Sequence, residues 1–481
     1  MKQEPVAKER PRLLPVGAGL PFVLLTSLFF LWAIPNNLTD TMLAAFKRIM
    51  SLTDSQTAWI QVVCYLLGYG CFALPAAMYI GKRGYKCGVL LGLAACVCGA
   101  LLFYPAMYAN SIASSLSFML YLLAILVLFA GLSFLETSAN SYVCALGDPR
   151  TATRRLNLAQ AFNPFGSLVG VIISQVFILS QLHTLSAQAR EALSPDVLQH
   201  VQASELKAIT TTYMLLGGVM LLLFFLLLWA KMPKVKEEEA PHYPIRIVAT
   251  QLIRKKKYVW AVVAQFFNIG AQISVWSFTI RYCMAQLGLD ALVEQVGIAP
   301  NPEKVVATLR GVEPVAASFY NLVEALGWYG MLPQTAEQAA ATYYFLSLVG
   351  FVAGRFVCTA LMKYIKPYKL LAGASLLAIV CSLMVVLCKG VWGVYALVAI
   401  SACLSLMFPT IYGLGVRNLG AYTKVAGSGM VMAIAGAAVL TQLQAMVSDA
   451  LGSIQQAYWI PLIAFVVIAY YSLVVAPEKG R

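Results

Sequence analysis

Long apolar stretches constrain this chain more than any other feature of its sequence. A helix that crosses a bilayer needs about 20 mostly apolar residues. Twelve such stretches lie near residues 18–46, 57–80, 86–108, 114–145, 156–182, 208–230, 258–288, 339–362, 368–388, 391–415, 424–447 and 456–475. The first is too long for the core of a signal peptide, so we expect it to remain as a helix. The sequence therefore predicts an all-α membrane protein with twelve transmembrane helices.

The composition excludes several classes of soluble protein. Charged residues make up 11% of the chain, against about 25% in a typical soluble domain. The net charge of +14 would suit nucleic acid, but the basic residues lie in short loops between the apolar stretches. The chain is therefore not expected to be a soluble enzyme, a disordered protein or a nucleic-acid binder.

The cysteine and histidine pattern favours neither a disulfide scaffold nor a metal site. No two of the 11 cysteines form a CxxC pair, and the three histidines lie outside the apolar stretches. We therefore expect free cysteines that behave as small apolar residues. No metal and no other cofactor is expected.

The distribution of Lys and Arg predicts the orientation of the chain. With a cytoplasmic N-terminus, 25 of the 34 basic residues fall in cytoplasmic segments and 7 in external ones. Cytoplasmic loops of membrane proteins carry such an excess. Both termini are therefore predicted to be cytoplasmic, and anionic lipid, not nucleic acid, accounts for the positive charge.

A polar, charged stretch divides the twelve helices into two sets of six. We predict a cytoplasmic tail (1–17), a six-helix bundle (18–230), a cytoplasmic linker (231–257), a second six-helix bundle (258–475) and a C-terminal tail (476–481). Two external loops are long, 183–207 and 289–338, and the second could contain short amphipathic helices. Weak similarity between the halves is typical of carriers that bind substrate near the membrane midplane.

Two carboxylic acids stand out because they lie inside apolar stretches. Asp40 and Glu136 have no basic residue within one turn, and a charge at a helix centre costs about 2.5–3.5 kcal/mol. Because burial disfavours the charged form, each should carry a proton part of the time. We interpret both as proton-coupling residues; the alternative is a permanently neutral acid that donates one hydrogen bond between helices.

Amide side chains recur near these acids at helical spacings. Amide groups match pairs of sugar hydroxyls, and an aromatic ring covers an apolar sugar face. The alternative is that the amides hold helices together. The candidate substrate-binding residues are Asn36, Asn37, Asn140, Gln160, Asn163, Gln265, Asn268, Gln272, Trp276 and, more weakly, Tyr412.

Longer motifs are more specific than these single residues. They are Phe29-Phe30-Leu31-Trp32-x-x-x-Asn36-Asn37-Leu38-Thr39-Asp40, Glu136-Thr137-x-Ala139-Asn140, Arg155-Leu156-Asn157-Leu158-Ala159-Gln160-x-Phe162-Asn163, Gln265-Phe266, Gly270-Ala271-Gln272, Trp276-Ser277, Ile280-Arg281-Tyr282 and Pro409-Thr410-Ile411. Together they resemble the L-fucose:proton symporter family of the major facilitator superfamily. The resemblance implies the twelve-helix major facilitator fold with a central cavity. It also implies proton coupling at Asp40 and Glu136, with nearby Asn, Gln and aromatic residues holding the sugar.

The predicted function is proton-coupled import of a hexose or 6-deoxyhexose, with L-fucose first, by alternating access. Such a carrier is not an enzyme, uses the proton as its coupling ion, and is expected to act as a monomer in the bacterial inner membrane. One alternative is a symporter for glucose, galactose or another hexose. A drug–proton antiporter should have a more apolar cavity with fewer clustered amides. A nutrient sensor would usually carry a soluble signalling domain.

Overall fold

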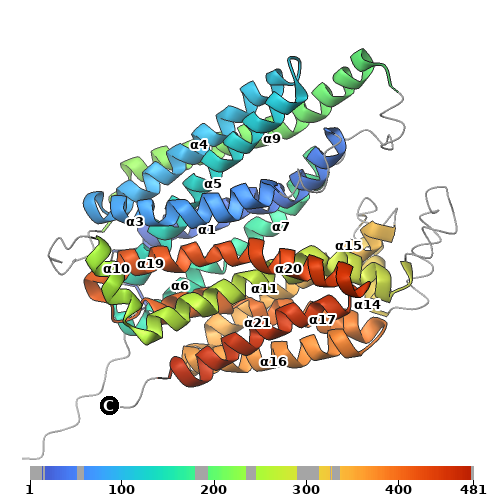
Figure 1. Cartoon of the computed structure of the whole chain (residues 1–481). Coiled ribbons are helices and arrows are strands. Elements are labelled where there is room, and N and C mark those ends of the chain that lie inside the picture. Colours follow the sequence, from blue (N-terminus) through green and yellow to red (C-terminus); the bar gives the residue numbers. More distant parts are fainter. Residues whose placement is uncertain are drawn as a thin grey trace, which may run out of the picture. The chain divides into compact units, whose positions relative to one another are not determined.

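The structure is a computed structural model that describes residues 13–14, 17–50, 59–178, 193–233, 245–289, 314–325, 327 and 336–477. The regular elements of these residues are helices, and 12 of them are long and apolar enough to cross a membrane. The chain forms two compact units (Figure 1). Unit 1 comprises Met1–Val259 and Pro409–Met432, and unit 2 comprises Trp260–Phe408 and Ala433–Arg481.

Unit 1 is built mainly from the first half of the chain. Within it α4, α5 and α9 run side by side, and α1 packs along α7 (Figure 1). Its elements are α1 (Gly19–Ile49), η1 (Val62–Cys71), α3 (Phe72–Arg83), α4 (Tyr85–Ala109), α5 (Ser114–Ala145), η2 (Pro149–Thr151), α6 (Ala152–Gln160), α7 (Asn163–Ile173), η3 (Ser174–Ile178), α9 (Pro195–Trp229), α10 (Ile245–Ile253), most of α18 (Met407–Gly415), η6 (Gly420–Tyr422) and α19 (Thr423–Met432).

Glycines and aromatic rings pack the core of unit 1. A Cβ on Gly92 of α4 would lie 2.9 Å from the carbonyl oxygen of Gly131 on α5. Small residues allow such close approach where lipid supplies no hydrophobic drive between helices. The Phe103 and Tyr213 rings stack 4.2 Å apart and join α4 to α9.

Unit 2 contains most of the second half. Its elements are α11 (Lys256–Gln286), α14 (Pro314–Ala325), α15 (Ala336–Leu361), α16 (Pro367–Leu387), α17 (Val391–Leu404), η7 (Ala433–Ala435), α20 (Gly436–Leu451), η8 (Gln456–Tyr458), α21 (Trp459–Tyr470) and η9 (Tyr471–Val475). The helix α16 packs against α17 and α21. At Gly270 α11 crosses α20 closely, because a Cβ there would lie 2.9 Å from the Gly436 carbonyl oxygen.

Two of the spanning segments are broken at similar places. In the fifth segment α6 ends at Gln160 and α7 begins at Asn163, with Pro164 in its first turn. In the eleventh segment α19 ends at Met432, and a 3₁₀ turn separates it from α20. The helices before the two breaks are of similar length: α6 contains 9 residues and α19 contains 10. Interrupted helices at corresponding positions of two halves are a feature of carriers and point to the substrate site.

One loop boundary predicted from the sequence is wrong. We expected residues 183–207 to form an external loop, but α9 begins at Pro195. Pro at the first helical position and Asp196 in the first turn both favour a helix start there. Hydropathy misses this polar extension, which is bonded to the rest of unit 1 on one side: Gln202 Nε2 donates to the Ile49 carbonyl oxygen at 2.9 Å.

Other connecting segments also contain helix. The amphipathic helix expected in the loop 289–338 is present as α14, and most other residues of that loop lie outside the described part. The predicted linker 231–257 contains α10 and the start of α11. Arg155, which we counted as a loop residue, lies in α6 because η2 and α6 begin the fifth segment at Pro149.

Candidate functional site

The first part of the candidate site in unit 1 joins α1 to η1. Asn36 Nδ2 donates to the Tyr69 hydroxyl at 3.2 Å and to the Trp32 carbonyl oxygen at 3.3 Å. Asn37 Nδ2 donates to the Ala33 carbonyl oxygen at 2.9 Å. Both asparagines are half-buried, so part of each side chain stays accessible. Asp40 lies on α1, but its side chain lies outside the described residues.

Tyr69 is a member of this cluster that the sequence analysis missed. It lies in η1, which is a π-helix, and the Ser133 hydroxyl of α5 donates to its carbonyl oxygen at 3.4 Å. π-helical turns inside helices often mark functional sites, because they change which side chains share a face. The sequence signal that could have identified Tyr69 is Tyr65, which lies four residues earlier. In the structure the two rings stack with their centroids 6.5 Å apart.

The second part of the site centres on Glu136 of α5. Its side chain is 8% exposed, and Oε2 has no hydrogen-bond partner among the described residues. One turn further along, Asn140 Oδ1 accepts a 2.7 Å hydrogen bond from Gln160 Nε2, while Asn140 Nδ2 has no partner within the described part of the chain. A buried acid thus lies one turn from an amide that retains an unused donor.

The break between α6 and α7 brings Asn163 toward α1. Its Nδ2 donates to the Phe29 carbonyl oxygen at 3.1 Å. Gly166 of α7 packs directly against the Phe30 backbone, which leaves no space for a Cβ. The unit 1 candidates therefore come from α1, η1, α5, α6 and α7.

The unit 2 candidates share α11. Gln265 and Asn268 are fully buried, and neither amide has a hydrogen-bond partner among the described residues. Gln272 is half-buried. Trp276 Nε1 donates to the Ser401 hydroxyl at 3.2 Å, and its ring meets Phe351 edge-on at 5.1 Å. Ser401 was not predicted from the sequence, because it lies in an apolar run without any motif.

Tyr412 occupies a different environment from the other candidates. It is fully buried in unit 1, where its hydroxyl lies 2.9 Å from the Ser141 hydroxyl of α5. Beside it, Asn157 Nδ2 donates to the Thr410 hydroxyl at 3.2 Å. Gly427 of α19 leaves no space for a Cβ between Ser141 and Tyr412. We call the hydrogen bond between the Ser141 and Tyr412 hydroxyls the Ser141–Tyr412 contact.

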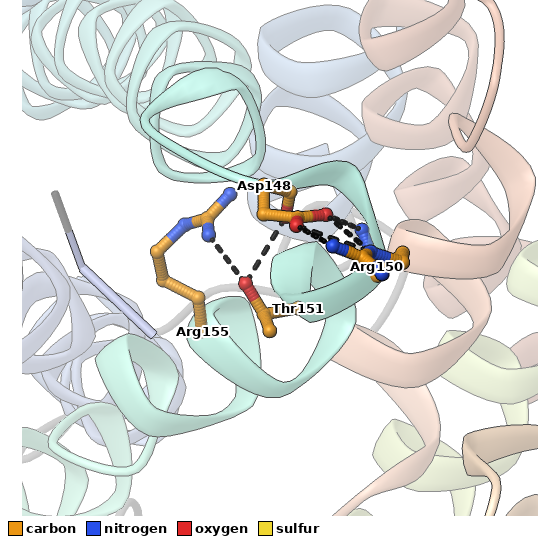
Figure 2. Close-up of polar contacts among 4 residues, drawn as sticks. All are labelled: Asp148, Arg150, Thr151 and Arg155. Carbon is orange, nitrogen blue, oxygen red and sulfur yellow. Dashed lines mark hydrogen bonds and ion pairs between the residues drawn. The ribbon is translucent and has the colours of Figure 1, made fainter. Parts of the chain in front are cut away.

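The loop after α5 is held by two arginines (Figure 2). Arg155 is fully buried and donates at 2.7 Å to the carbonyl oxygens of both Val143 and Cys144, the last turn of α5. A cation suits a helix C-terminus, where carbonyls are unpaired and the dipole is negative. Arg150 forms a 2.7 Å ion pair with Asp148, and its side-chain hydrogen bonds lower the pKa of that carboxyl below the ordinary value.

The Major Facilitator Superfamily model matches residues 22–302. The L-fucose-proton symporter of Haemophilus influenzae is 35% identical over 462 residues, which cover 94% of this chain and 95% of that protein. A glucose/galactose transporter of Brucella abortus is 28% identical over 456 residues, with coverage of 95% and 94%.

A solved structure of a major facilitator superfamily transporter is also similar to this chain. A crystal structure of the transporter FucP in the outward conformation is 32% identical, with a TM-score of 0.78 and coverage of 96% of this chain and 99% of that chain. The predicted fold class is thereby confirmed. The chain belongs to the major facilitator superfamily and, within it, to the family of the L-fucose-proton symporters.

Proposed function

We propose that this protein is a proton-coupled sugar symporter that imports L-fucose. The observation that supports the proposal is that Glu136 Oε2, which is buried and has no hydrogen-bond partner among the described residues, lies one turn from the Asn140–Gln160 hydrogen bond. The first group suits a proton, and the second suits sugar hydroxyls. A symporter for glucose or galactose is the second candidate, because a relative over nearly the whole chain carries that name.

The proposed role of Glu136 follows from the cost of enclosing a charge. When the site faces outward, protonation of Glu136 or Asp40 removes that cost, so sugar and proton enter the site together. Release of the proton on the other side then frees the sugar. One inward charge gains about 2.3 kcal/mol per 100 mV, which supports about a fortyfold gradient of sugar.

The remaining assignments complete this proposal. The sugar ligands are Asn36, Asn37, Asn140, Gln160, Asn163, Gln265, Asn268, Gln272 and Trp276, with Tyr69 added from its hydrogen bond to Asn36. The protein acts as a monomer in the bacterial inner membrane, with both termini cytoplasmic. It performs no covalent chemistry and needs no cofactor besides the transported proton.

Under this proposal Tyr412 acts in gating. The Ser141–Tyr412 contact lies near the end of α5 that leads to the basic loop around Arg150. Alternating access requires that end to open so that sugar can leave, and the contact must then break. The contact therefore stabilises the state that is closed on the cytoplasmic side, and Tyr412 need not touch the sugar.

Tyr412→Phe should shift the protein toward the cytoplasm-open state. Losing one buried hydrogen bond costs about 1 kcal/mol, or about a fivefold change in population. Cys144, one turn from Ser141 and 7% exposed, is a built-in reporter. Its rate of alkylation by N-ethylmaleimide, followed by peptide mass spectrometry, should rise about fivefold.

Tyr121→Phe is the matched control for this change. The Tyr121 hydroxyl also pairs with a buried hydroxyl, that of Thr210 at 3.0 Å. Tyr121→Phe should leave the alkylation rate of Cys144 unchanged. Equal rates in the wild type and Tyr412→Phe would rule out the gating role.

Transport by proteoliposomes tests the function itself. With an acidic exterior, addition of L-fucose should alkalinise the medium and drive accumulation that a protonophore abolishes. The same response to galactose or glucose, but not to fucose, would favour the second candidate. No alkalinisation with any hexose tried, including N-acetylglucosamine, would exclude sugar–proton symport.

A binding-site variant sharpens this experiment. Gln160→Ala removes an amide proposed to bond a sugar hydroxyl and should weaken sugar affinity about tenfold, since such a hydrogen bond contributes up to about 1.5 kcal/mol. The control is Asn110→Ala, which removes a buried amide that donates to Gln202 Oε1 at 3.4 Å. Equal affinities in the two variants would contradict a sugar site at Gln160.

A further inference from the structure

The helix α10 lies across the end of the spanning helices of unit 1, transverse to α19 (Figure 1). One of its faces is buried. Val248 and Leu252, four residues apart, are 8% and 2% exposed, and α10 packs against α19. The buried face therefore holds α10 transverse to α19, which begins one of the candidate membrane spans.

The opposite face of α10 carries exposed apolar groups, and exposed cations follow directly after the helix. Ile247 is 46% exposed and Ile253 is 70% exposed. The next four residues, Arg254 to Lys257, are all exposed. The sequence contains no acidic residue between Glu239 and Asp290, so no neighbour along the chain offsets this charge.

Two contacts attach this segment to η6 and α19. Lys255 Nζ lies 5.3 Å from the centre of the Tyr422 ring. The Tyr258 hydroxyl donates to the Ala426 carbonyl oxygen of α19 at 3.0 Å. Because α11 begins at Lys256, Lys256 and Lys257 lie in the first turn of a spanning helix and Arg254 lies just before it. We therefore expect these cations at the level of lipid headgroups.

We propose that α10 and the cations that follow it form a docking site for anionic phospholipid headgroups. Ile247 and Ile253 enter the boundary between headgroups and acyl chains, while Arg254, Lys256 and Lys257 contact lipid phosphates. Lys255 is occupied by Tyr422 and is not required. A lipid surface is favoured over a protein partner because the site is continuous with a transmembrane helix.

Hydrogen exchange of the α10 amides tests this site without sugar or a pH gradient, so its result is independent of transport. The protein is placed in nanodiscs of phosphatidylcholine alone or with phosphatidylglycerol. The anionic lipid should slow exchange of residues 247–253 by more than about tenfold, and high salt should reduce the effect. Equal exchange in the two lipids would overturn the proposal.

Variants separate charge from helix stability. Arg254→Gln/Lys256→Gln/Lys257→Gln should lose most of the response to phosphatidylglycerol while the α4 amides keep their protection. Lys363→Gln/Lys366→Gln/Lys369→Gln removes the same charge from three exposed positions in the α15–α16 turn and the first turn of α16, and should leave α10 unchanged. An unchanged response in the first variant would show that these cations do not bind the headgroups.

Discussion

Glu136→Gln should leave the protein able to bind and exchange sugar but unable to accumulate it. Glutamine has nearly the same shape as glutamic acid and cannot release a proton, so the transport cycle loses its coupling ion. Glu136 is 8% exposed and lacks a partner at Oε2, so the variant removes no described hydrogen bond of that atom. The expected accumulation ratio falls from about fortyfold to about one at 100 mV.

The measurement is pH-driven uptake beside sugar counterflow in the same proteoliposomes. Asp449→Asn, which neutralises an exposed acid at the end of α20, is the control and should accumulate sugar normally. Asp40→Asn tests the second predicted acid in the same way. Wild-type accumulation in both Glu136→Gln and Asp40→Asn would remove carboxylate coupling from the mechanism.

Arg155→Met should destabilise unit 1 severely. The guanidinium donates to four oxygens, those of Val143, Cys144, Leu13 and the Thr151 hydroxyl. A hydrogen bond to a charged group contributes about 1.5–3 kcal/mol. The two short bonds to α5 alone predict a loss of about 3–6 kcal/mol, a large part of the 5–15 kcal/mol that typically stabilises a domain.

Thermal unfolding of detergent-purified protein measures this loss. Arg155→Lys should recover only part of it, because one ammonium group cannot reproduce the planar fork of guanidinium donors. Arg154→Met removes an equal charge from the neighbouring residue, whose buried Nε has no hydrogen-bond partner among the residues that the structure describes, and should cost much less. Similar melting temperatures for Arg154→Met and Arg155→Met would show that capping of α5 is unimportant.

Hydropathy predicted the architecture because lipid imposes the same apolar length on every spanning helix. Hydropathy did not predict the helical segments that lie outside the apolar spans. The start of α9 at Pro195 is polar and packs on protein, and α10 is too short to read as a span. Breaks such as that between Gln160 and Asn163 depend on local backbone geometry, and only Pro164 hinted at one.

The sequence predicted which residues belong to the candidate site better than it predicted which partners they contact. Spacing along a helix predicts a shared face, and the structure brings Asn140 and Gln160 together across two helices. Spacing does not reveal partners on other elements. The Tyr412 hydroxyl is committed to Ser141, which lies 271 residues away in the chain. Tyr69 turns toward Asn36 in a π-helix, which has no simple sequence signal.

The composition of unit 1 has a consequence for biosynthesis. Its last piece, Pro409–Met432, is translated some 150 residues after Val259. Until those residues leave the ribosome, Ser141 and Asn157 have no Tyr412 and Thr410 to bond with. The first six helices must therefore wait in the membrane incomplete, and the nascent chain can finish folding there only when its tenth and eleventh helices arrive.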